Sequence, residues 1–487
     1  MNLFSRLLAP ALIGLLGLGA VSATPTPAVA PVAAQSATTN GARLSPTQPI
    51  PPAELEAFVD GVMRQAMVSD HVAGAAVSVV QNGAVILKKG YGYAHLSPAQ
   101  AVDPDTTVFR IASISKTFTW ILLLQQVEAG HMRLDAPINL YLPERLRIAD
   151  QGYSQAITVN SLMNHTPGFE DRALGQLFER DPGRVRPLNV YLQEEKPARV
   201  REPGVLVSYS NYGVGLAGAA VAEVTGKPFE ALAEMQILRP LGMNQTTFRE
   251  PHGMRAGLPA AMPQEIAQNL AEGYRWTPNG FQPQAFEFVG QVAPAAAAST
   301  TAADMTRYML MFLGGGAYGE ARIYGPTAAL AFATPQPAPP GVPALRHGLM
   351  PFPLPGGITG VGHVGDTLFF HSAMVLVPQY NLGIFVTTNS DRGLAVAGKL
   401  PADIVGRFYA APAAPFPARS EELRSVRGLF EGDYVSVRRA RHGLEGLVER
   451  VSGASHVSVT TEGHLLIRGI GASRLYTPAG PDRKSVV

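Results

Sequence analysis

The stretch FRIASISKTFTWILLL, Phe109 to Leu124, decides how the rest of the chain is interpreted. Its second half is apolar on every side, which is the pattern of a helix buried in a core. Lys116 nevertheless stands near its start, and a lysine is almost never fully buried without a partner. Ser113 lies three residues earlier, so on a helix the two side chains share one face, one turn apart. A core helix that begins in this way is a candidate for catalysis.

The two side chains have complementary chemistry. A serine hydroxyl becomes a good nucleophile when a neighbouring base removes its proton, and a buried lysine can be that base because desolvation lowers its pKa. The helix N-terminus adds positive potential next to Ser113, which favours an oxyanion formed on attack. The alternative interpretation is a helix cap beside a lysine that extends toward solvent. Because this spacing occurs by chance in many chains, the pattern by itself favours the alternative.

The composition indicates a globular protein and excludes several classes of function. With 487 residues and 46% hydrophobic content, the chain can bury a large core and more than one domain. Lys+Arg 39 against Asp+Glu 37 gives a net charge of +2 without a dense basic run, so we expect no nucleic-acid partner. The chain has no cysteine, which removes disulfides and thiol chemistry. No His and carboxylate cluster has metal-ligand spacing, so we expect no metal and no cofactor.

The N-terminal sequence predicts export. Arg6 precedes a short apolar run, and small residues follow at 21–23, which is typical of a signal peptide over residues 1–23. The run is short for a membrane span. Residues 24–50 are rich in Ala, Thr and Pro and predict a disordered leader. We therefore expect a periplasmic or secreted protein with no transmembrane segment after cleavage.

Two predicted hairpins place strands at both ends of the main domain. Two β-rich runs flank Asn82-Gly83, a strong signal for a two-residue turn, and predict a hairpin over residues 74–90. A second pair of runs predicts a hairpin over residues 372–388. Mostly helical signals lie between them. The predicted fold class is α+β, an antiparallel sheet flanked by helices with a helical region inserted, over residues 51–410.

Local signals also mark the ends of helices in this domain. Thr301 and Asp304 predict a capping box before an amphipathic run. Gly130 predicts the end of the helix that begins at Ser113.

The C-terminal residues differ in character from the main domain. Residues 411–418 are a Pro/Ala linker, and the short alternating runs after them predict a small all-β module over residues 419–487. Glu462-Gly463 is predicted to be a turn, and the last residues carry no structural signal, which leaves open a frayed or truncated tail.

Two further motifs change the interpretation of Ser113 and Lys116. The sequence YSN at 209–211 lies on a predicted turn ahead of an apolar, small-residue helix, and HVG at 363–365 precedes a predicted strand. In this order the three motifs resemble those of the class C β-lactamase and penicillin-binding-protein superfamily of serine hydrolases: Ser-x-x-Lys, Tyr-x-Asn and Lys or His-x-Gly. Flanking stretches such as ITVNSLMNHTPGF and LGIFVTTNS are similar to this family as well, and the resemblance covers residues 51–410.

The resemblance implies a role for each motif residue. Ser113 would be the acylated nucleophile and Lys116 its base, while Tyr209 would share proton transfer in acylation and toward the leaving group. Asn211 would orient Lys116 and bind the substrate amide or carbonyl. The backbone N–H groups of Ser113 and Asp366 would form the oxyanion hole.

The third motif would contribute His363 to catalysis and Gly365 to substrate binding. Many members of the superfamily have lysine at the first position, where a permanent charge holds the substrate carboxylate. Histidine has an ordinary pKa of about 6.5 and would offer an uncharged hydrogen bond instead. His165 is left aside because its loop is structural in relatives, and Asp135 and Asp304 stand where turns and caps favour carboxylates.

The resemblance predicts a serine hydrolase that acts through an acyl-enzyme on a small peptide or ester, with cell-wall peptides among the candidate substrates. The leading prediction is a D-amino-acid-specific peptidase of the D-Ala-D-Ala carboxypeptidase type. An esterase of family VIII type and a penicillin- or peptidoglycan-binding sensor without turnover are the alternatives. Variable loops at about 170–200 and 250–295 would build the substrate pocket. The oligomeric state is left open.

Overall fold

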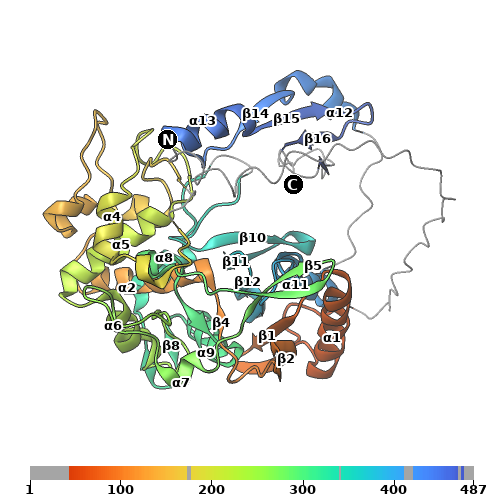
Figure 1. Ribbon diagram of the computed structural model, residues 1–487. Coiled ribbons are helices and arrows are strands. Elements are labelled where there is room, and N and C mark those ends of the chain that lie inside the picture. The colour runs from red at the N-terminus through yellow and green to blue at the C-terminus, as the bar shows by residue number, and fades with distance from the viewer. Residues whose placement is uncertain (1–42, 173–176, 339–341, 411–419, 470–472, 477–487) are drawn as a thin grey trace, which may run out of the picture. The chain divides into compact units, whose positions relative to one another are not determined.

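The computed structural model describes residues 43–172, 177–338, 342–410, 420–469 and 473–476. The predicted signal peptide, most of the leader and the predicted linker lie outside these residues. The centre of the fold is a seven-stranded antiparallel sheet of order β10-β11-β12-β13-β1-β2-β3 (Figure 1). Its strands are β1 (Gly74–Gln81), β2 (Ala84–Leu96), β3 (Ala99–Ala101), β10 (Met350–Leu354), β11 (Ile358–Asp366), β12 (His371–Val377) and β13 (Leu382–Thr388).

Both faces of the sheet are covered, so its central strands are buried on two sides. On one face α1 (Pro52–Ser69) and α11 (Leu394–Phe408) form a core with Val77 and Val79 of β1. On the other face α9 (Ala302–Leu313) and the inserted helical region form a second core with Ala76 and Val80. Alternate side chains of a strand point to opposite faces, so every residue of β1 is buried and its sequence is mostly apolar.

The inserted region is built around three helices that pack on one another: α2 (Ser115–Glu128), α5 (Asn211–Thr225) and α8 (Ala293–Ala296). Further helices are α3 (Val159–Met163), α4 (Leu188–Glu194), α6 (Phe229–Ala233), α7 (Gln264–Ala267) and α10 (Pro326–Ala333). Short two-stranded sheets pair β4 (Phe109–Arg110) with β7 (Ser299–Thr300), β5 (Gly273–Thr277) with β6 (Gly280–Gln284) and β8 (Ala317–Tyr318) with β9 (Ala321–Arg322). The predicted α+β fold class is confirmed.

Both predicted hairpins are present, and β1 pairs with β13 to join them. Asn82 and Gly83 have φ values of 51° and 82°, the left-handed backbone that a two-residue turn needs. Gly130 follows the last turn of α2 with φ of 75°, as predicted. The pairing of β1 with β13 brings the two ends of the domain together, which explains why strand signals stand at both ends of the sequence.

Two local predictions are wrong in part. Residues 43–50, which belong to the predicted leader, pack against the domain: Leu44 N–H donates to the Phe408 carbonyl over 2.8 Å, and Ile50 is buried. Thr301 does cap α9 by accepting from the N–H of Asp304. The Asp304 carboxylate, however, accepts from the Gln245 N–H and the Thr246 hydroxyl instead of closing the capping box.

The C-terminal module contains the predicted sheet, of order β14-β15-β16-β17, and the predicted turn at Glu462-Gly463. Its strands are β14 (Gly432–Val435), β15 (Ala454–Val459), β16 (Leu465–Arg468) and β17 (Arg474–Tyr476). The prediction of an all-β module is wrong, because the module also contains α12 (Glu421–Ser425) and α13 (Gly443–Ser452). Leu444, Leu447 and Val448 have helical spacing, but two glycines within the same ten residues weaken that signal.

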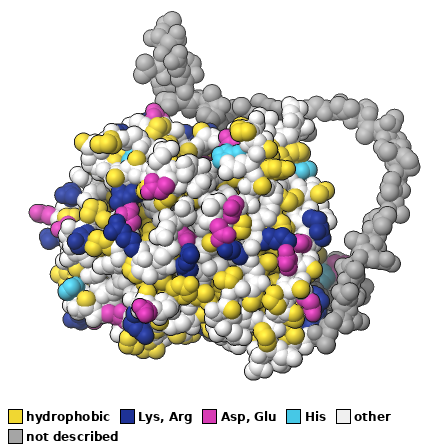
Figure 2. Space-filling model, turned by 90° about the horizontal axis from the view of Figure 1, so that it is seen from below, with side chains coloured by type: hydrophobic (Ala, Val, Ile, Leu, Met, Phe, Trp, Pro, Cys, Tyr) yellow, Lys and Arg dark blue, Asp and Glu magenta, His cyan; other side chains and the backbone are white. Residues whose placement is uncertain are grey.

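The surface carries no dominant charge. Figure 2 shows acidic and basic side chains interspersed over one face of the molecule, in line with the net charge of +2. In the described part of the chain, we find no helix that is both long and apolar enough to cross a membrane.

The close approach of α5 to α8 requires a glycine. A Cβ atom at Gly218 would lie 2.3 Å from Cγ of Pro294, whereas a Cβ atom at Gly61 in α1 would have open space. We expect Gly218→Ala to lower the free energy of unfolding by about 1–3 kcal/mol through overpacking. Gly61→Ala, the same chemical change, should raise it by about 0.5–1 kcal/mol because alanine is the better helix former. Urea unfolding of both variants measures the difference, and equal stabilities would contradict the close packing of α5 on α8.

Candidate active site

Ser113 lies in a 3-10 turn, η1 (Ala112–Ile114), directly before α2. Ala112 has φ of 41°, a left-handed conformation that is unfavourable for alanine and marks local backbone strain beside the serine. Lys116 follows in the first turn of α2, and its Nζ lies 3.0 Å from Oγ of Ser113. The three-residue spacing thus brings the two side chains together as predicted.

Lys116 is fully buried, and its amine contacts three oxygens. Besides Ser113 Oγ, these are Oδ1 of Asn211 at 2.7 Å and the carbonyl of Ala295 at 2.8 Å. Burial lowers the pKa of Lys116 well below its ordinary value, and the nearby charge of Arg438 lowers it further. A neutral amine has two N–H groups and one lone pair. Because the amide oxygen and the carbonyl can only accept, the lone pair is left for the Ser113 hydroxyl proton.

The YSN motif is held by the start of α5. The Ser210 hydroxyl caps this helix by accepting from the N–H of Gly213. This cap fixes Asn211 as the first helical residue and Tyr209 as the residue before the cap. The Tyr209 ring lies beside the amine of Lys116, with Nζ 4.8 Å from the ring centroid. Burial raises the pKa of Tyr209 above its ordinary value, and a hydrogen bond with Ser113 opposes this shift only in part. Tyr209 is therefore a neutral phenol near pH 7.

The HVG motif lies within β11, which runs directly past Ser113. A Cβ atom at Gly365 would be 2.0 Å from the Ile111 carbonyl and 3.1 Å from the backbone N of Ser113, so only glycine fits there. Asp366 ends the strand, and its carboxylate contacts Nδ1 of His371 at 2.7 Å. The chain segment that carries Asp366 is thus adjacent to the one that carries Ser113.

His363 is buried and uncharged. Burial, together with the charge of Lys116, lowers the pKa of His363 to about 3. Its Nδ1 lies 2.5 Å from the Val364 carbonyl, which assigns the proton to Nδ1. Nε2 is buried and has no hydrogen-bond partner among the described residues. His363 therefore presents an acceptor, whereas the sequence predicted that it would donate an uncharged hydrogen bond to a substrate carboxylate.

A cavity of about 330 Å³ opens in front of Ser113. Five of the predicted site residues line it: Ser113, Tyr209, Asn211, His363 and Asp366. The other lining residues are Leu177, Phe178, Met350, Val364 and Arg438. Leu177 and Phe178 come from the 170–200 loop that was predicted to shape the pocket, whereas the 250–295 segment contributes the Ala295 carbonyl behind Lys116.

Three contributors were missed by sequence reasoning. The Ala295 carbonyl is a backbone group, which no side-chain motif can indicate. His165, which is not among the predicted site residues, lies with its ring centroid 4.4 Å from that of Tyr209 and accepts from the Ser210 N–H through Nδ1, so it supports the tyrosine. Arg438 comes from the C-terminal module, and its guanidinium lies 4.8 Å from the centroid of the Tyr209 ring. No pattern in the module pointed to this contact.

Comparison with known proteins agrees with this geometry. The profile of the Beta-lactamase family matches residues 59–405. The chain belongs to the β-lactamase family of serine hydrolases. Esterase EstB of Burkholderia gladioli is 30% identical over 219 residues, which are 42% of this chain and 55% of that protein. Protein flp of Staphylococcus aureus strain MW2 is 26% identical over 193 residues, 39% of this chain and 38% of that protein. The chain thus spans about half the length, or less, of these curated relatives.

Solved structures of other proteins share the fold. An octameric penicillin-binding protein homologue from Pyrococcus abyssi superposes with a TM-score of 0.60 at 22% identity, covering 88% of this chain and 90% of its own. A β-lactamase/D-alanine carboxypeptidase from Pseudomonas syringae superposes with a TM-score of 0.57 at 22% identity. The match covers 73% of the present chain and 98% of the Pseudomonas syringae protein. These likenesses establish the fold and leave the substrate open.

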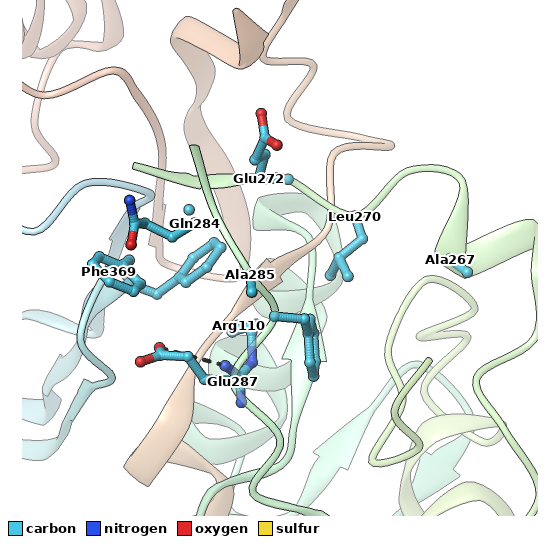
Figure 3. Close-up of a pocket in the computed structure, with 12 residues that line it drawn as sticks. Arg110, Ala267, Leu270, Glu272, Gln284, Ala285, Glu287 and Phe369 are labelled. Carbon is cyan, nitrogen blue, oxygen red and sulfur yellow. Dashed lines mark ion pairs between the residues drawn. The ribbon is translucent and has the colours of Figure 1, made fainter. Parts of the chain in front are cut away.

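A buried ion cluster supports the strand that precedes Ser113. Arg110 of β4 is 1% exposed, and its guanidinium nitrogens lie 3.6 Å from a Glu250 oxygen and 3.8 Å from a Glu287 oxygen. Figure 3 shows the guanidinium directed toward Glu287, beside a cavity of about 200 Å³. Glu250 also accepts from the N–H groups of Val289 and Gly290.

Glu287 extends this network to the turn after Asp366 by accepting from the Leu368 N–H over 3.3 Å. Burial raises the pKa of Glu250 and of Glu287, and the charge of Arg110 opposes both shifts. The cluster therefore connects the segment before Ser113 with the segment after Asp366.

Removing the cation from this cluster should destabilise the fold. Arg110→Met leaves two carboxylates buried without a counter-charge, and we expect a loss of about 3–5 kcal/mol in the free energy of unfolding at pH 7. Because burial raises both carboxyl pKa values in the folded state, the unpaired groups are neutralised as the pH falls, so the loss should shrink toward pH 5. Adding Glu287→Gln to Arg110→Met should recover part of the loss. Urea unfolding measures all three effects, and an unchanged stability would show that the cluster is not a net contributor.

Proposed function

We propose that the protein is an exported serine hydrolase that forms an acyl-enzyme on Ser113 and acts on peptides that contain D-amino acids, in the manner of a D-Ala-D-Ala carboxypeptidase. The observation that carries the proposal is the surroundings of Lys116, where two fixed acceptors take its N–H groups and leave its lone pair for Ser113. The predicted signal peptide supports the periplasmic or secreted location.

In the proposed reaction Lys116 accepts the Ser113 proton as Oγ attacks the substrate carbonyl. The N–H groups of Ser113 and Asp366 hold the resulting oxyanion. Tyr209 donates its phenolic proton to the leaving group and is reprotonated from Lys116, which restores the neutral amine. Water then attacks the acyl-enzyme with the same base, and Ser113 regains its proton. The raised pKa of Tyr209 supports the role of acid, and the lowered pKa of Lys116 supports that of base.

An esterase is the second candidate function. The identity of 30% to esterase EstB favours it, and an acyl-enzyme mechanism serves esters and amides alike. A sensor that is acylated without turnover shares the same first step. Rates on D-peptides, β-lactams and short-chain esters, measured on one preparation, distinguish the three functions.

Labelling tests the nucleophile. A fluorophosphonate should add its mass to the peptide that contains Ser113, because this hydroxyl has a neighbouring base and faces the cavity. Ser113→Ala should abolish the label, and the unfolded native chain should not react, because the base is then no longer in place. A label on a different serine would refute the proposed site.

A lysine-to-arginine change tests the base. Guanidinium stays protonated, so Lys116→Arg should lose about 2–5 kcal/mol of transition-state stabilisation in kcat/KM. In the native enzyme kcat/KM should fall as the pH drops below the lowered pKa of Lys116, because the amine then carries a proton. His363, with a pKa of about 3, should add no second break between pH 5.5 and 8.5. Near-native kcat/KM in Lys116→Arg would exclude lysine as the base.

A further inference from the structure

Residues 436–442, which connect β14 to α13 in the C-terminal module, bring an arginine to the cavity in front of Ser113. Arg438 lines this cavity together with Ser113 and Tyr209. Its Nε donates to a carboxylate oxygen of Asp171 over 2.6 Å, and its guanidinium lies over the Tyr209 ring. The module therefore contributes a side chain to the active site, although no catalytic motif lies within it.

The main domain holds this connection firmly through backbone contacts. The carboxylate of Glu170, which is buried, accepts from the N–H groups of Arg441 at 2.8 Å and His442 at 3.1 Å. The Asp171 N–H donates to the carbonyl of Arg439, and Arg201 donates to the carbonyl of Val437. Arg438 is thus placed by its neighbours on both sides, so little conformational entropy is left to lose when it binds a ligand.

The charges around the cavity identify what Arg438 can bind. Among the described residues that line the cavity, Arg438 carries the permanent positive charge, while His363 is neutral and the carboxylate of Asp366 contacts the ring of His371. Lys116 lies behind Ser113, and its amine already contacts three oxygen atoms of the protein. The Arg438 side chain is 47% exposed, and beyond Nε no hydrogen bond of its guanidinium is found within the described chain. Its two terminal nitrogens can therefore donate parallel N–H bonds to the two oxygens of one carboxylate.

We propose that Arg438 forms a carboxylate-binding subsite, so that the substrates of this site are acyl compounds with a free carboxylate near the scissile bond. This inference rests on the proposed acylation of Ser113. In this proposal the C-terminal module supplies the positive charge that binds the substrate carboxylate, which a lysine at position 363 would otherwise supply. Asp171 orients the guanidinium through Nε and leaves the Nη edge for the ligand.

Arylboronic acids test the subsite on the full-length protein. The Ser113 oxygen adds to boron and its proton passes to Lys116, so inhibition of p-nitrophenyl butyrate hydrolysis reports occupancy of the site. We would compare phenylboronic acids that carry a carboxylate at the meta or para position with the matching carboxamides. The native enzyme should favour at least one carboxylate over its carboxamide by about tenfold, the contribution of a charge-assisted bidentate contact. Arg438→Gln should lose this preference.

Arg424→Gln is the matched control, because Arg424 lies in the same module and pairs with exposed Glu421. It should keep the preference of the native enzyme. A preference that is absent from the native enzyme, or unchanged in Arg438→Gln, would overturn the subsite while leaving acylation of Ser113 intact. If no boronic acid inhibits and no ester is hydrolysed, the proposed function fails instead, and the subsite with it.

Discussion

The burial of the Lys116 amine is the constraint on which the site depends. Placing a charged ammonium in a core costs several kcal/mol, so the group either finds partners or gives up its proton. Here both occur: the pKa is lowered, and the N–H groups meet oxygens of Asn211 and Ala295. One acceptor belongs to α5 and the other to α8, so these helices and α2 must be in place together. Glycine and alanine at their contacts allow the approach, as at Gly218.

The sheet supplies the other side of the site by joining distant parts of the chain. The pairing of β1 with β13 closes the domain, and the register of β12 against β11 then places Gly365 against the backbone of Ser113. The site therefore lies where the edge of the sheet meets the helical region. The ion cluster around Arg110 connects the same two parts from behind. A change in register by one residue would place a side chain where only glycine fits.

Features determined by neighbouring residues could be predicted from the sequence, and features determined by distant residues could not. The turn at Asn82-Gly83 follows from two residues, and the contact of Ser113 with Lys116 follows from one helical turn. The carboxylate of Asp304 instead contacts Gln245 and Thr246, which are 59 and 58 residues away in the sequence. The motif residues were found because their order matched a known family, whereas Arg438 belongs to no motif and reaches the cavity through backbone contacts of residues 436–442. Such contacts leave no pattern in a single sequence.

The distribution of charge explains why histidine at 363 and arginine at 438 are compatible with a lysine base. A second lysine at position 363 would be buried beside Lys116, and each cation would disfavour the charge of the other. Burial is the larger cause of the lowered pKa of His363, and the charge of Lys116 lowers it further, as it would for any cation at this position. Arg438 stands at the cavity rim, half exposed and paired with Asp171, where a charge costs little desolvation. From there its field also lowers the pKa of Lys116, so a cation placed to bind substrate helps to keep the base unprotonated.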